Sequence, residues 1–92
     1  SSKHKTTVLI IHNRCKNPHA LAAKIVNLIN DYVGVQVASQ TTTPSHIRVS
    51  IFDVNLRDDE LLYILNRAQQ EVEHCIDKVE ITRETRTYTE YF

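Results

Sequence analysis

The sequence feature that most limits the possible folds is the apolar stretch Val8-Leu9-Ile10-Ile11. Three of its four residues are β-branched. A short run of this kind is typical of a strand that is buried on both faces, whereas a half-exposed strand alternates apolar and polar residues. We therefore expect this stretch to be the central strand of a small sheet.

The length of the chain sets the size of that core. Ninety-two residues are enough for one domain, in which roughly 60 to 65% of the surface of the unfolded chain becomes buried. An apolar content of 41% and a charged content of 24% are typical of a globular protein. We expect a domain over residues 6–82, preceded by a flexible arm at 1–5 and followed by a strand extension at 83–92.

The charge and cysteine content exclude several classes of protein. Eleven basic and eleven acidic residues give no net charge, which disfavours nucleic-acid binding through bulk electrostatics and favours association with other proteins. No run approaches the roughly 18 apolar residues of a membrane span, so we expect no membrane partner. Two cysteines are too few for a disulfide-dense secreted scaffold, which favours an intracellular location.

Periodicity and capping signals predict the order of the elements. Asn17 and Pro18 are suited to begin a helix, and Gly34 is suited to end it in a left-handed conformation. The second helix should be capped by Asn55 or Asp58 and should carry Cys75 at the end of its apolar face. The expected elements are strands at about 6–13, 35–40, 46–54 and from 78, with helices at 17–33 and from 55 or 58 to about 76.

This strand-helix-strand-strand-helix-strand order resembles the ferredoxin-like fold, an α+β sandwich with a four-stranded antiparallel sheet. The resemblance covers essentially the whole chain. It implies a strand order of 4-1-3-2, with both helices on one face of the sheet and the strands at 6–13 and 46–54 in its centre. A fold of this kind carries no function by itself.

The same topology would bring histidines and cysteines to one rim of the domain. His12, Cys15, His74 and Cys75 lie near connections that end on that side. One alternative is a metal site, since cysteine and neutral histidine are good zinc ligands. A second is a disulfide or redox pair, and a third is that Cys75 is simply a small core residue.

The sheet face without helices is a candidate binding surface. Arg48 and Phe52 should lie on it, and this surface resembles that of an RNA-recognition motif, where aromatic residues stack on bases. The match is partial, because Ile10 stands where an aromatic residue is expected and the glycine of that motif is absent. The nucleic-acid alternative would use Arg48, Phe52, Arg14 and Lys16, and the other alternative is a protein interface at Phe52.

The C-terminal segment is too long for the domain. Residues 78–92 contain no glycine or proline and would span roughly 50 Å when extended, whereas a typical strand covers 17–20 Å. We expect strand exchange between two copies, which would seat Tyr88, Tyr91 and Phe92; the alternative is a frayed tail.

The sequence carries no recognisable catalytic motif or cofactor motif. Asp58, Asp59 and Glu60 are consecutive, so on a helix they diverge and compensate its dipole. A single glycine excludes a glycine-rich phosphate loop. The leading hypothesis is therefore a non-catalytic protein-interaction or self-assembly module without a cofactor, acting through the open sheet face and the C-terminal strand.

Overall fold

The computed structural model describes the backbone of three stretches of the chain. These are residues 2–34, 37–52 and 56–88, and side chains are described over 5–32, 34, 37–52 and 56–84. The expectations that concern Asn55, Tyr91 and Phe92 lie outside the described residues.

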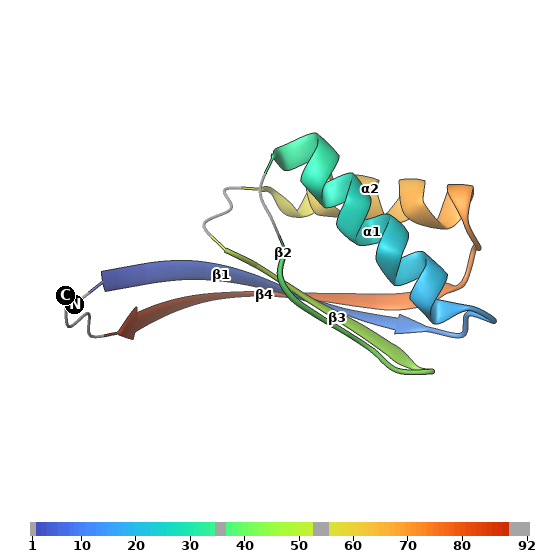
Figure 1. Ribbon diagram of the computed structural model, residues 1–92, viewed down its shortest axis with the longest axis horizontal. Coiled ribbons are helices and arrows are strands. Elements are labelled where there is room, and N and C mark those ends of the chain that lie inside the picture. The colour runs from blue at the N-terminus through green and yellow to red at the C-terminus, as the bar shows by residue number, and fades with distance from the viewer. Residues whose placement is uncertain (1, 35–36, 53–55, 89–92) are drawn as a thin grey trace.

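Four strands and two helices follow one another in the predicted order (Figure 1). The strands form one antiparallel sheet in the order β2-β3-β1-β4, which is the order 4-1-3-2 read from the other edge. Both helices cover the same face of this sheet. The ferredoxin-like architecture is therefore confirmed, with β1 (Ser2–Asn13), α1 (Pro18–Val33), β2 (Val37–Thr42), β3 (His46–Phe52), α2 (Asp58–Glu71) and β4 (Ile76–Tyr88).

Strand β1 occupies the central position that its apolar stretch predicts. It pairs with β3 from Thr6 to His12, and with β4 along its whole length. Leu9 and Ile11 point toward the helices and are fully buried. On the opposite face Val8 is only 3% exposed, so the strand is covered on both sides at its centre.

The core lies between the helices and β1, β3 and the first half of β4. Side chains that repeat every three to four residues along each helix meet alternate side chains of the central strands, as amphipathic elements in a two-layer sandwich do. Fully or almost fully buried are Ile25, Ile29, Leu61, Leu65, Ile47, Val49 and Ile51.

The two helices begin differently from one another. In α1, Asn17 Oδ1 accepts a hydrogen bond from the Ala20 N–H, and Gly34 ends the helix with a φ of 70°, as predicted. In α2 the N-cap is Arg57, so the expectation for Asp58 was wrong. The Glu60 carboxylate accepts the Arg57 N–H there, which satisfies that donor without a short polar cap.

The two ends of the chain also differ from expectation. Instead of a flexible arm, Ser2 to Lys5 continue β1 and pair with Thr85 to Tyr88 of β4. The arm lengthens β1, and this gives the long C-terminal segment a partner within the same chain. Figure 1 shows the resulting β1–β4 ribbon, blue and red, extending well past the helices.

Replacing a core side chain of α2 should destabilise the fold. Leu65→Ala should lower the free energy of unfolding by about 2–5 kcal/mol, because it leaves a cavity where the side chain is now 2% exposed. Gln70→Ala, an exposed change in the same helix, should alter it by less than about 0.5 kcal/mol. Urea unfolding of both variants checks this, and equal midpoints would contradict the described core.

Candidate functional site

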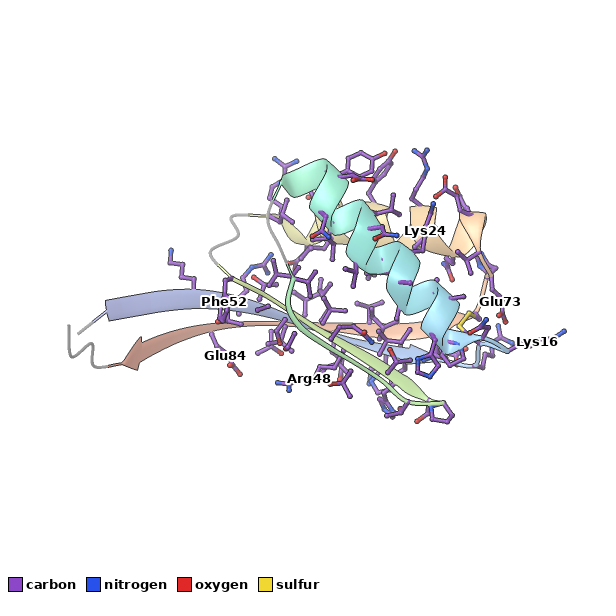
Figure 2. All side chains as sticks on the ribbon, viewed as in Figure 1. Lys16, Lys24, Arg48, Phe52, Glu73 and Glu84 are labelled. Carbon is purple, nitrogen blue, oxygen red and sulfur yellow. A yellow bond between two sulfur atoms is a disulfide. The ribbon has the colours of Figure 1, made fainter. Side chains whose placement is uncertain are left out.

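Two connections at one end of the domain are joined by a disulfide. Cys15, which follows β1, is bonded to Cys75, which precedes β4, across a sequence separation of 60 (Figure 2). Their Cα atoms are 4.9 Å apart, within the range that a disulfide requires. The convergence of the cysteines on one rim is therefore present, and the pair is a disulfide.

The backbone around the disulfide fixes the two connections against each other. The Arg14 N–H donates to the Cys75 carbonyl over 3.0 Å, and the Cys15 N–H donates to Asn13 Oδ1 over 3.1 Å. Because α2 ends at Glu71, Cys75 lies beyond the helix rather than on its apolar face as predicted. It is nevertheless 2% exposed and part of the core.

Glu73 is a site residue that the sequence patterns did not predict. Its carboxylate accepts hydrogen bonds from the N–H groups of Lys16 and Asn17, over distances of 2.9 to 3.3 Å. Helix α1 has no acidic residue in its own first turn. Glu73 reaches in from the α2–β4 junction and supplies the negative charge that a helix N-terminus favours. The lack of an acidic residue in the first turn of α1 was the only sign in the sequence that a distant carboxylate would contact this helix N-terminus.

The predicted histidine ligands do not join the cysteines. Among the described residues, Cys15, Glu73 and Cys75 are the group whose potential ligand atoms lie within 4.8 Å of one another. His12 lies elsewhere, with Nε2 3.2 Å from Glu80 Oε2 and its ring 4.5 Å from that of His46. His74 is exposed. In the disulfide state each sulfur is bonded to the other, so the thiolates that zinc prefers are not present.

Strand alternation places His12, Glu80 and Lys78 together on the open face of the sheet. Lys78 Nζ is 3.3 Å from Glu80 Oε1, and His12 reaches the other oxygen of that carboxylate. The hydrogen bond from His12, followed by that from Lys78, holds the pKa of Glu80 below its usual value. The described part of the open face of β4 therefore carries one positive side chain, Lys78, followed by the carboxylates of Glu80 and Glu84.

Arg48 and Phe52 both lie on the open face, as predicted. They flank a shallow hollow of about 190 Å³ whose floor includes Val8 and Ser50. Thr6 also lines it, and its Oγ1 is buried without a hydrogen-bond partner. Figure 2 shows Arg48 and Glu84 on the side of the sheet away from the helices.

The remaining basic residues of the nucleic-acid alternative are separated from this hollow. Arg14 Nε is 2.9 Å from Asp77 Oδ1, so its charge is already paired. Lys16 lies beside Glu73 at the end of the domain that carries the disulfide (Figure 2). The four predicted residues thus do not form one continuous basic surface.

A second hollow, of about 370 Å³, lies between the helices and is lined by Tyr32, Tyr63 and Leu56, among others. Arg67 Nη1 donates to both tyrosine hydroxyls, over 3.2 and 3.4 Å. This hydrogen bond from Arg67 lowers the pKa of Tyr63. The tyrosine rings meet edge to face with 6.1 Å between their centroids, which is a favourable contact between α1 and α2.

Strand β4 forms one edge of the sheet, beside β1. It is 13 residues long, whereas β2 has 6 and β3 has 7. In the described part of the chain no strand pairs with its outer edge. Tyr88, predicted as an interface residue, is the last residue of β4 and pairs with Ser2 through the backbone.

Comparison with known proteins shows a similarity in backbone arrangement. No family model matches the sequence, and no curated protein matches it. A de novo designed protein, Foldit4, is similar with a TM-score of 0.45 and 15% identity over 96% of this chain and 100% of that chain. A domain of unknown function, DUF77, from Bacillus cereus is similar with a TM-score of 0.37 and 16% identity, over 96% of this chain and 78% of that chain. At this level of likeness neither structure indicates a function.

Within the described residues, neither helix has the length and apolar character needed to cross a membrane.

Removing the disulfide should destabilise the fold without changing its topology. The bridge closes a loop of 60 residues, so Cys15→Ala/Cys75→Ala should lower the free energy of unfolding by about 2–4 kcal/mol. Urea unfolding of the oxidised protein, the dithiothreitol-reduced protein and the double variant measures the effect. Coincident unfolding curves for all three would show that the bridge adds no stability.

Glu73→Gln should weaken the start of α1. The substitution keeps the size of the side chain but removes the charge that faces the Lys16 and Asn17 N–H groups. We expect a loss of about 1 kcal/mol, similar to that of a helix cap. Glu71→Gln removes a charge that pairs with Lys24 and Arg67 at the protein surface and should cost less. Thermal unfolding measures both, and an equal or larger loss in E71Q would contradict the role assigned to Glu73.

Proposed function

We propose that this protein is a non-catalytic self-assembly module, in which the free edge of β4 pairs with the same edge of a second copy. The single observation that carries the proposal is the length of β4, whose outer edge has no strand partner among the described strands. Such an edge is a template for another strand.

The end of the β1–β4 ribbon that extends past the helices also supports pairing with a second copy. In the part of the chain that the structure describes, the pairing of β1 with β3 starts at Thr6, so Ser2 to Lys5 pair there only with Thr85 to Tyr88, as a two-stranded piece of sheet. A pair of strands on its own is only marginally stable in water, and three or more strands are needed for independent stability. A neighbouring β4 would supply the third strand.

The molecule also lacks a charge that would keep copies apart. Its formal net charge is zero, and a net charge near zero favours association. The open face would continue from one copy into the next, which would double the surface around Arg48 and Phe52. Nucleic-acid binding has less support, because Arg14 is paired with Asp77 and Lys16 lies at the far end of the domain.

The solution mass of the full chain tests the proposal. Light scattering should give twice the chain mass of 10.6 kDa, and truncation after Thr82 should move the mass toward that of one chain, because it removes half of the paired edge. Phe52→Ala, on the open face away from the β4 edge, is the control and should keep the full mass.

Two results would contradict assembly through the β4 edge. One is a full chain that has the mass of a single copy at every concentration. The other is a mass that falls in F52A but not in the truncated chain, which would place the interface on the open face. A salt titration with a short RNA tests the nucleic-acid alternative, since phosphate contacts give a steep loss of affinity with salt.

A further inference from the structure

The two faces of β4 differ in character. Val79 and Ile81 are half-buried and pack against the core, on the side of the helices. The alternate residues Lys78, Glu80 and Glu84 lie on the open face together with Thr82. A partner strand must therefore match two rows of side chains at once.

Symmetry restricts how two β4 edges can pair. Directly opposite residues of two antiparallel strands point to the same side of the sheet. When a two-fold axis relates the two strands, this holds only if the axis passes between one residue and the same residue of the other copy. An axis at Glu80 or Glu84 would place that carboxylate against its own copy. An axis at Thr82 would place Glu80 of each copy against Glu84 of the other, and an axis at Arg83 would place two guanidinium groups against each other. Each of these four positions brings like charges together, which destabilises the pairing.

An axis at Ile81 avoids these conflicts. It places Lys78 of each copy opposite Glu84 of the other, and Ile81 against Ile81 on the side of the core. It also pairs residues 76–86 of both copies, whereas an axis at Val79 pairs only 76–82 and one at Thr85 only 82–88. Charge complementarity and overlap length therefore select the same register.

The helix layer points to the same position independently. Two side chains of α2 accept hydrogen bonds from β4. Asp58 accepts one from Arg83 Nη1, and Gln69 accepts one from the Ile76 N–H. Leu62 lies between them on the same side of the helix, at the i+4 position from Asp58, and this side faces away from the α1 contacts of Arg67. Leu62 is nevertheless 47% exposed. Its position between these two contacts places Leu62 level with the part of β4 near Ile81.

We infer that two copies pair β4 to β4 around a two-fold axis at Ile81, with Leu62 of each α2 covering the centre of the interface. This inference rests on the proposed self-assembly and specifies the surface through which two copies would meet. The dimer would have one continuous eight-stranded sheet, with the two α2 helices next to each other on the helix side of that sheet. The apolar centre of Ile81 and Leu62 is flanked by two Lys78–Glu84 contacts, one on each side of the axis.

A charge exchange tests this register. Lys78→Glu and Glu84→Lys should each raise the dissociation constant of the dimer about tenfold, because two contacts per dimer become like-charge pairs. The double variant K78E/E84K restores opposite charges and should return the constant to within about threefold of the parent protein. Sedimentation equilibrium measures the constants, and circular dichroism checks that each variant is folded.

Leu62→Ser provides a second test in the helix layer. It should also raise the dissociation constant about tenfold, while Gln70→Ser on the same helix should leave it unchanged. If the single charge variants and L62S dimerise like the parent protein while truncation after Thr82 abolishes dimerisation, self-assembly stands and this register is wrong. Weakening by both single variants without rescue in the double variant would also overturn it. A parent protein that never dimerises would overturn the proposed function itself.

Discussion

Strand β1 is paired along both edges from Thr6 to His12, and this pairing positions the other strands of the sheet. Its apolar centre is covered by the helices on one face and by open-face side chains on the other, and its two edges hold β3 and β4 in place. A continuous apolar run of this kind is typical of a strand whose two faces are both buried, as they are at the centre of this sheet. Once β1 is central, β4 becomes an edge of the sheet, and the length of the chain beyond the core determines how much of that edge is free.

Much of this could be predicted from the sequence. The run at Val8 to Ile11 identified the central strand, and Asn17, Pro18 and Gly34 marked the limits of α1, because each of these signals acts within a few residues. The Arg57 cap of α2 and the position of Cys75 beyond that helix were missed. Both depend on where a helix stops and how the chain turns back, which tertiary contacts determine.

The site was predictable only in part, for the same reason. Topology correctly brought Cys15 and Cys75 to one end, but the separation of His12 from them depends on the alternation of β1, which sends its side chain to the open face beside Glu80. Glu73 contacts backbone N–H groups more than fifty residues away, and no local pattern encodes that contact. The pairing of Ser2 to Lys5 with the end of β4 was missed because neither segment is apolar.

Hydrogen exchange of the β4 amides shows whether the outer edge of β4 pairs with a second copy. In an antiparallel pair every second N–H of an edge strand points away from its neighbour and exchanges readily unless another strand covers it. Pairing of β4 with a second copy should protect the outward-pointing amides between residues 76 and 86 when the protein concentration is raised above the dissociation constant. Exchange rates for these amides that stay the same at all concentrations would contradict it.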